Sequence, residues 1–298
     1  MRHAILGAGG VGGVVGAVLA KEGESVTLIL RPESLKSYPP ELSLESPLGS
    51  FSVPVDRATS VAQPFDVLWV TVKATHLDTA LRSVVVRPDQ LGAVVPLLNG
   101  IDHVAPLRAR FGHDRVVPGS IGIESERAAP GKIVHRGMNP RITLASMGES
   151  RLAPAAEKLR AFGIACQFWP DEMKILWTKL SFLAPFALTT TAAAKTIGEV
   201  VRDPEWRKRL EGAAREVCAV GTASGTLLDV SVVLQFFEKT SPSGRSSMQK
   251  DVAAGNPPEL DAIAGPILRG GQTYGIDVPA TRELASMIRG ISAAAVRS

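Results

Sequence analysis

Short apolar runs, almost uninterrupted by polar side chains, recur through the first half of the chain. They occupy residues 3–6, 25–30, 66–72, 93–100 and 115–123. A strand that is buried on both faces has this continuous apolar character, and such strands belong to parallel sheets that helices cover. The pattern therefore predicts a Rossmann-type domain, built on a parallel sheet, at the start of the chain.

The pattern changes further along the chain. Residues 130–148 alternate and contain turn residues, which predicts an added antiparallel hairpin before a last helix and strand that end near Pro170. Beyond this point helical periodicity dominates, at residues 172–183, 204–224, 229–240, 257–273 and 279–296. We therefore expect a Rossmann-type domain at 1–170 and an all-helical domain at 171–298, with substrate held in the cleft between them.

The first apolar run leads into a turn rich in glycine, "LGAGGVGG", and then into a helix that ends near Lys21. Gly7, Gly9 and Gly12 have the GxGxxG spacing, which allows a tight turn, close approach of a diphosphate and close packing of helix on strand. The amides at the start of the helix would receive the anion. The alternative is a glycine turn of purely structural use. The expected cofactor contacts are Gly7, Gly9, Gly10, Val11 and Gly12.

The residue that closes the second predicted strand bears on the choice of dinucleotide. Cofactors without a 2′-phosphate usually meet an acidic side chain there, whereas this chain has Arg31, with Ser34 and Lys36 close behind. A cation and a hydroxyl suit a phosphate monoester, so the sequence predicts NADP(H). The alternative is that Arg31 is a solvated surface residue.

Neither a secretory signal nor a membrane span is expected. The charged and apolar opening is similar to a signal, but six glycines between residues 7 and 16 disfavour the helix that a signal core forms. No run reaches the roughly eighteen uninterrupted apolar residues of a spanning helix. The best candidate, at 180–194, is interrupted by Pro185.

The composition argues against other kinds of partner. The 298 residues carry a net charge of only +4, with basic and acidic side chains interspersed, which favours acidic small molecules over nucleic acid. Cys166 and Cys218 lack redox or metal spacing, as is typical of two reduced, buried thiols in a cytosolic protein. No metal is predicted, because no ligand spacing relates the histidines. The apolar content of the helical half allows a homodimer without requiring one.

Further segments complete a resemblance to a known family. The glycine turn, Arg31 and the Asn99-Gly100 pair occur together with "TVKATH", "PGKIVH", "LWTKL", "SSMQKD", "PELDAIAGPI" and "YGIDVP". Their order and spacing resemble those of the ketopantoate reductases (2-dehydropantoate 2-reductases) over nearly the whole chain. The resemblance implies NADPH-dependent reduction of a 2-oxo acid.

The resemblance assigns roles to five residues. Lys179, in "LWTKL", corresponds to the general acid that protonates the keto oxygen, and Glu259 to the acid that orients this lysine and binds a substrate hydroxyl. Asn99 would touch nicotinamide and substrate, Ser247 the substrate carboxylate, and Lys73 the cofactor. From the residues alone, a surface lysine, a helix-terminal acid and an N-cap serine remain alternatives. The neighbouring candidates are Lys174, Arg245 and Ser246.

The chain departs from the family where a substrate hydroxyl would bind. The family has asparagines shortly after the lysine and just ahead of the "SSM" serines, whereas residues 180–198 contain none and a glycine and an arginine precede these serines. The hydroxyls that remain nearby are those of Thr189, Thr190 and Thr191. This departure argues against ketopantoate itself, so another 2-oxo acid or a bulkier ketone is an alternative substrate. Two alternatives stay open: a hydroxyacid or opine-type dehydrogenase, and a dinucleotide-binding sensor without catalysis.

Overall fold

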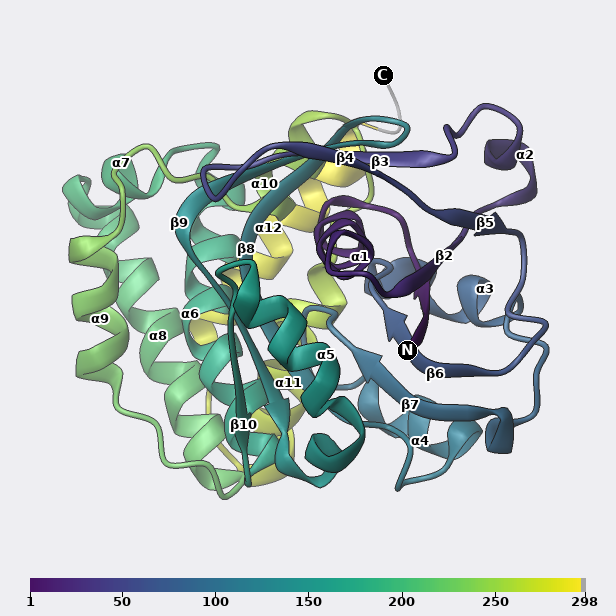
Figure 1. The fold of residues 1–298 in the computed structure, drawn as a ribbon. Helices are drawn as coiled ribbons and strands as arrows, with labels where there is room; N and C mark the ends of the chain where they lie inside the picture. Colours follow the sequence, from purple (N-terminus) through teal and green to yellow (C-terminus); the bar gives the residue numbers. More distant parts are fainter. Residues whose placement is uncertain (296–298) are drawn as a thin grey trace. The chain divides into compact units, whose positions relative to one another are not determined.

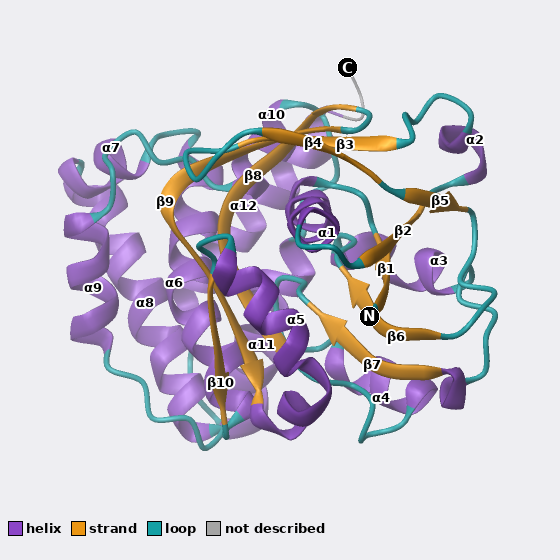
Figure 2. Ribbon diagram, viewed as in Figure 1, coloured by secondary structure: helices purple, strands orange, loops and turns teal. Residues whose placement is uncertain are grey.

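The computed structural model describes residues 1–295, which form two compact units. The first contains Met1–Leu98 and His103–Ile175, and the second joins the short segment Asn99–Asp102 to the chain from Leu176 onward. Figure 1 follows the chain by colour, and Figure 2 distinguishes helices from strands. The predicted order, a parallel α/β part followed by a helical part, is confirmed. The last predicted helix was expected to reach residue 296, which lies outside the described residues.

A five-stranded parallel sheet is the centre of the first unit. Its order is β5-β2-β1-β6-β7, formed by β1 (Arg2–Leu6), β2 (Ser25–Ile29), β5 (Asp56–Ala58), β6 (Phe65–Val70) and β7 (Leu91–Pro96). Leu68 and Trp69 are neighbours on β6 and both fully buried, yet they belong to different apolar clusters because side chains alternate between the two faces of a strand. Burial on both faces explains the continuous apolar runs.

Helices cover both faces of this sheet. α1 (Gly10–Lys21) and α5 (Glu149–Ala161) contribute to the apolar cluster that contains Trp69. α3 (Leu77–Leu81) and α4 (Val104–Phe111) contribute to the cluster on the opposite face. The sheet is therefore doubly covered, as the sequence predicts.

A second sheet packs on α1 and was only partly expected. Its order is β10-β9-β3-β4 with β8 paired to β9, formed by β3 (Glu41–Glu45), β4 (Phe51–Pro54), β8 (Gly119–Ala129), β9 (Lys132–Ala145) and β10 (Ala165–Trp169). β8 and β9 form the added antiparallel hairpin, but it begins well before residue 130. The chain reverses at Pro130 and Gly131, whose φ of 75° is in the region that glycine favours.

The interpretation of residues 115–123 as a strand of the parallel sheet is wrong. Val116 makes a single parallel bridge with Val94, and the chain then joins the second sheet at Gly119. Pro118 separates the two parts and has no N–H to donate to a ladder. The apolar run is thus shared between two sheets, which its periodicity alone does not reveal.

The second unit is built from helices. They are α6 (Glu172–Ala193), α7 (Ile197–Arg202), α8 (Pro204–Ala223), α9 (Val230–Lys239), α10 (Ser247–Ala253), α11 (Leu260–Tyr274) and α12 (Pro279–Ala295). The prediction that α6 ends at residue 183 is wrong: the missing N–H of Pro185 removes one backbone hydrogen bond, while the buried Ala184, Ala187 and Leu188 hold the helix in the core. None of the helices between residues 1 and 295 is long and apolar enough to cross a membrane.

A buried carboxylate joins two of these helices. Glu216, on α8, accepts hydrogen bonds from the backbone amides of Ala280 and Thr281 at 2.7 and 2.8 Å. These amides belong to the first turn of α12, where no intrahelical acceptor is available to them. Glu216 is only 8% exposed, so it acts as a cap supplied from another part of the chain.

Candidate active site

The glycine turn between β1 and α1 has a backbone that side chains would obstruct. Gly7 has a φ of 110°, and its carbonyl accepts a hydrogen bond from Thr71 Oγ1 at 2.8 Å. A Cβ on Gly12 would lie 2.2 Å from the Gly7 carbonyl oxygen and 2.4 Å from Thr71 Oγ1. Glycine at these two positions is therefore required for the turn and for its contact with the residue that follows β6.

The start of α1 has the properties of an anion site. The N-cap residue is Gly9, so no side chain at this position accepts a hydrogen bond from the first amides of α1. The first turn of α1 also contains no acidic residue. The amide of Gly13 reaches the Gly9 carbonyl at 2.8 Å, so the amides of Gly10, Val11 and Gly12 precede the first intrahelical hydrogen bond. A Cβ on Gly9 would meet no atom within 4 Å, which leaves its backbone open to a ligand. The turn thus fits a phosphate group.

Two basic side chains follow strands that end at the same edge of the sheet. Leu6 of β1 lies opposite Ile29 of β2 and Val70 of β6. Arg31 follows β2, is exposed, and is the N-cap of the short helix α2 (Pro32–Leu35). Lys73 follows β6 and is half-buried. The carboxyl ends of parallel strands are where dinucleotides bind in this class of fold, so both residues stand at the expected edge.

Asn99 belongs to the second unit, although it lies only three residues after the end of β7 in the first unit. Its side-chain amide donates to Glu259 Oε2 at 3.0 Å. The next residue, Gly100, has a φ of 81°, and a Cβ on it would lie 2.2 Å from the carbonyl oxygen of Ala262 on α11. The segment 99–102 therefore approaches α11 so closely that glycine is needed. The structure thus brings Asn99 and Glu259 together, although 160 positions separate them in the sequence.

Lys179 and Glu259 form the charged part of the same cluster. Lys179 lies on α6 and is half-buried, and Glu259 is 7% exposed. Burial lowers the pKa of Lys179 to about 8, and the negative charge of Glu259 opposes this shift. An ammonium with a pKa near neutrality can donate a proton in a reaction at physiological pH. Lys174, the alternative candidate, is exposed and belongs to the first unit.

The two serines of the "SSM" segment have different surroundings. Ser246 is the N-cap of α10, is 2% exposed, and accepts from the Gln249 amide at 3.1 Å and from Thr190 Oγ1 at 3.0 Å. Ser247 is the first residue of α10 and is exposed, as is Arg245. The N-cap role belongs to Ser246, and Ser247 is the accessible hydroxyl. The sequence leaves this distinction open.

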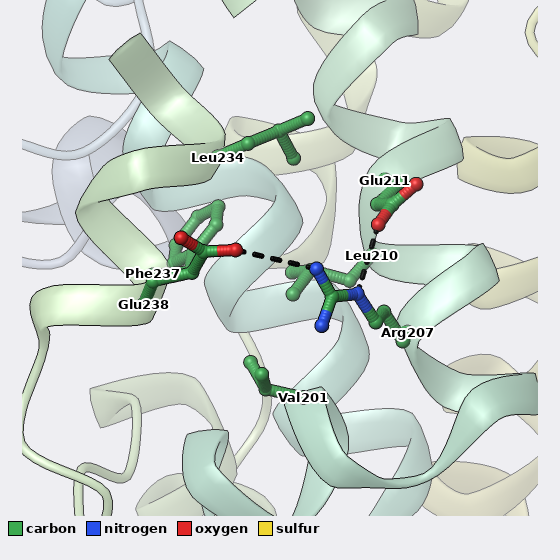
Figure 3. A pocket seen from close by; sticks show the side chains of 7 residues that line it. All are labelled: Val201, Arg207, Leu210, Glu211, Leu234, Phe237 and Glu238. Atoms are coloured by element: carbon green, nitrogen blue, oxygen red, sulfur yellow. Dashed lines mark hydrogen bonds and ion pairs between the residues drawn. The ribbon is translucent and has the colours of Figure 1, made fainter. Parts of the chain in front are cut away.

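Residues of α7, α8 and α9 that the sequence did not single out line a pocket of the second unit (Figure 3). Arg207, one of the lining residues, pairs with Glu211 at 3.0 Å and with Glu238 at 3.3 Å. Two carboxylates thus share one guanidinium. None of the predicted site residues lines this pocket.

The cysteines lack the features of reactive thiols. Both Cys166 and Cys218 are unpaired and buried, as predicted, and burial raises the pKa of each to about 11. Among residues 1–295, no three histidine, cysteine or acidic side chains are grouped so as to hold a metal ion.

Sequence patterns missed the contribution of β8 to the glycine turn. Arg127 Nη1 lies 3.5 Å from the Ala8 carbonyl oxygen, and Ser125 lies against Gly10. More than a hundred residues separate these partners, and no motif joins them. Only the pairing of β8 in the second sheet brings them to the turn.

Family comparisons match both parts of the chain. Residues 3–149 match the family described as Ketopantoate reductase PanE/ApbA, and residues 171–292 match its C-terminal part. The 2-dehydropantoate 2-reductase of Caulobacter vibrioides is 30% identical over 299 residues, which cover 96% of this chain and 97% of that protein. YkpB, an uncharacterized oxidoreductase of Bacillus subtilis, is 27% identical, with 94% and 95% covered.

Solved structures share the fold over the same length. The PanE/ApbA family ketopantoate reductase from Ralstonia eutropha has a TM-score of 0.89 at 27% identity, with 99% of this chain and 100% of that chain covered. A ternary structure of D-mandelate dehydrogenase with NADH and anilino(oxo)acetate has a TM-score of 0.88, with the same coverage, at 22% identity. At this lower identity the likeness shows the fold alone.

Proposed function

Because the chain belongs to the ketopantoate reductase family, whose members are oxidoreductases acting on CH–OH groups, we propose that it reduces a 2-oxo acid with NADPH. The observation that carries the proposal is the cluster of Lys179, Glu259 and Asn99, which unites a proton donor of lowered pKa with a carboxylate and an amide. The relatives named 2-dehydropantoate 2-reductase make ketopantoate the first candidate substrate.

Residues of the glycine turn would hold the cofactor, which supplies the hydride when bound. The proposed contacts are Gly7, Gly9, Gly10, Val11, Gly12, Arg31, Lys73 and Asn99. The open backbone at Gly9 and the uncapped amides of α1 support a diphosphate. The exposed Arg31 supports a 2′-phosphate and hence NADP(H) over NAD(H). In this proposal residues 1–170 hold the dinucleotide and residues 171–298 hold the acid and the substrate.

The side chains of the cluster have distinct tasks. Lys179 donates a proton to the keto oxygen as the carbonyl carbon becomes a CH–OH group. Glu259 keeps the ammonium protonated near neutral pH, because its negative charge opposes the effect of burial. Asn99, held by Glu259, positions the substrate beside the nicotinamide. Ser247 offers its exposed hydroxyl to the substrate carboxylate.

The face of α6 that carries Lys179 favours a substrate with an apolar side chain. Leu183 follows Lys179 by four residues, so it shares that face of the helix. Its side chain cannot hydrogen-bond a substrate hydroxyl. The chain therefore suits a 2-oxo acid that lacks the hydroxyl of ketopantoate at least as well as ketopantoate itself.

The test is a panel of 2-oxo acids and hydroxyacids, with NADPH consumption or formation as the readout. We expect reduction of at least one 2-oxo acid, and a loss in kcat of about 100- to 10,000-fold in Lys179→Ala. Lys174→Ala is the matched control and keeps the wild-type rate. Faster oxidation of a hydroxyacid would favour a dehydrogenase in the opposite direction. NADPH binding without turnover of any member would favour the sensor.

A further inference from the structure

β8 passes directly over the start of α1. A Cβ on Gly10 would lie 2.5 Å from the carbonyl oxygen of Ser125 and 2.9 Å from its Oγ. The hydroxyl of Ser125 is buried and makes no hydrogen bond within the described residues. A buried hydroxyl without a partner, next to the amides that begin α1, is an unexplained donor at the edge of the phosphate site.

Arg127 lies two residues further along β8 and faces the same side, because side chains of a strand repeat every second residue. The ladder with β9 is regular between the two, with Ser125 opposite His135 and Arg127 opposite Ile133. Arg127 Nη1 donates to the Ala8 carbonyl in the glycine turn over a long 3.5 Å. A guanidinium has five N–H donors, so this contact leaves most of them for another acceptor.

The charge of Arg127 also reaches the segment that follows Arg31. Tyr38 comes shortly after α2, and burial raises its pKa while the positive charge of Arg127 opposes that shift. Arg127 is exposed, so its guanidinium is accessible to a ligand. The guanidinium of Arg127 therefore lies at the glycine turn, where a dinucleotide of this fold class places its diphosphate.

We propose that Arg127 is a further cofactor-binding residue, whose guanidinium grips a phosphate of the dinucleotide, with the Ser125 hydroxyl as a second donor. The inference rests on the proposed function, since it requires a dinucleotide at the glycine turn. Arginine suits the task because its planar fork matches the oxygens of a phosphate. β8 thus acts as the second wall of the phosphate site, opposite the first turn of α1.

The test is a titration of NADPH and of NADH, followed by cofactor fluorescence, with wild type, Arg127→Gln and Arg136→Gln. Arg136 is the matched control, because it lies on the same hairpin and pairs with Glu126 at 2.9 Å. We expect Arg127→Gln to weaken binding by about 5- to 20-fold and Arg136→Gln to leave it unchanged. Ser125→Ala weakens binding by a smaller factor.

The two nucleotides distinguish the phosphate involved. An equal loss for NADPH and NADH assigns Arg127 to the diphosphate, and a loss confined to NADPH assigns it to the 2′-phosphate. Affinities of Arg127→Gln equal to those of wild type for both nucleotides would overturn the inference while leaving the proposed function intact. Failure of the wild type to bind either nucleotide would instead refute the proposed function.

Discussion

The amide of Asn99 donates to the carboxylate of Glu259 at 3.0 Å, although 160 positions separate the two residues in the sequence. The carboxylate in turn interacts electrostatically with Lys179 on a third segment of the chain. Three segments of the second unit thus meet in one cluster. A change in Glu259 should therefore be felt at both of the other residues.

The pH dependence of the rate should report the Lys179 ammonium. A general acid works in its protonated form, so kcat/KM for 2-oxo acid reduction should be constant below the pKa of about 8 and fall as pH rises above it. The descending limb should be absent from the residual rate of Lys179→Ala. Steady-state rates between about pH 6 and about pH 10, a window around that pKa, provide the measurement. If kcat/KM of Lys179→Ala fell over the same pH range as that of the wild type, the fall would belong to a group other than Lys179.

Replacing Glu259 by glutamine should move this limb to lower pH. The carboxylate raises the pKa of Lys179, and a neutral side-chain amide at this position cannot do so, although it has nearly the same shape. At pH 7 less of the lysine is then protonated, and kcat/KM falls. The matched control is Asp261→Asn, an exposed acid on the first turn of α11. If Glu259→Gln and Asp261→Asn gave the same pH profile, Glu259 would not control the lysine.

Arg31 should select between the two nicotinamide nucleotides. We expect Arg31→Ala to weaken NADPH binding by about 10-fold, because a charge-assisted contact with the 2′-phosphate is lost, and to change NADH binding little. Arg87→Ala is a suitable control, since Arg87 is an exposed arginine of the same unit that pairs with its neighbour Asp89. Equal losses for NADPH and NADH would argue against recognition of the 2′-phosphate by Arg31.

Ala194 occupies a backbone conformation that costs free energy. It follows α6 and has a φ of 54°, the one positive φ of a residue other than glycine between residues 1 and 295. The left-handed region costs an L-residue roughly 1–2 kcal/mol, and glycine avoids this cost. Glycine also raises the conformational entropy of the unfolded chain, which offsets part of the gain in stability. Ala194→Gly should therefore stabilise the protein by about 0.5–1 kcal/mol in urea unfolding.

Ala193→Gly is the control for this change, because Ala193 is the last residue of α6 and is helical. Glycine at a helical position should destabilise the protein by up to about 1 kcal/mol. Opposite signs for the two adjacent substitutions would confirm that the conformation of residue 194 is the cause. Destabilisation by both would show that Ala194 makes contacts worth more than its strain.

Features that depend on neighbouring residues could be predicted from the sequence alone. The glycine spacing, the apolar runs of β1, β2, β6 and β7, and the helical periodicity beyond Pro170 were enough to predict the parallel sheet and the helical part. Each of these signals comes from residues within one turn, strand or helix, where side-chain spacing reflects local backbone geometry. The positions of Gly7 and Gly12 in the turn follow in the same way.

Which distant residues meet depends on how the whole chain packs. This packing placed β8 in the second sheet, beside the glycine turn, and it gave Ser246 the buried cap and Ser247 the exposed hydroxyl. It also set the pKa of Lys179, which depends on burial and on a carboxylate eighty positions away. Burial and long-range electrostatics are properties of the packed chain, so no pattern within a segment can specify them.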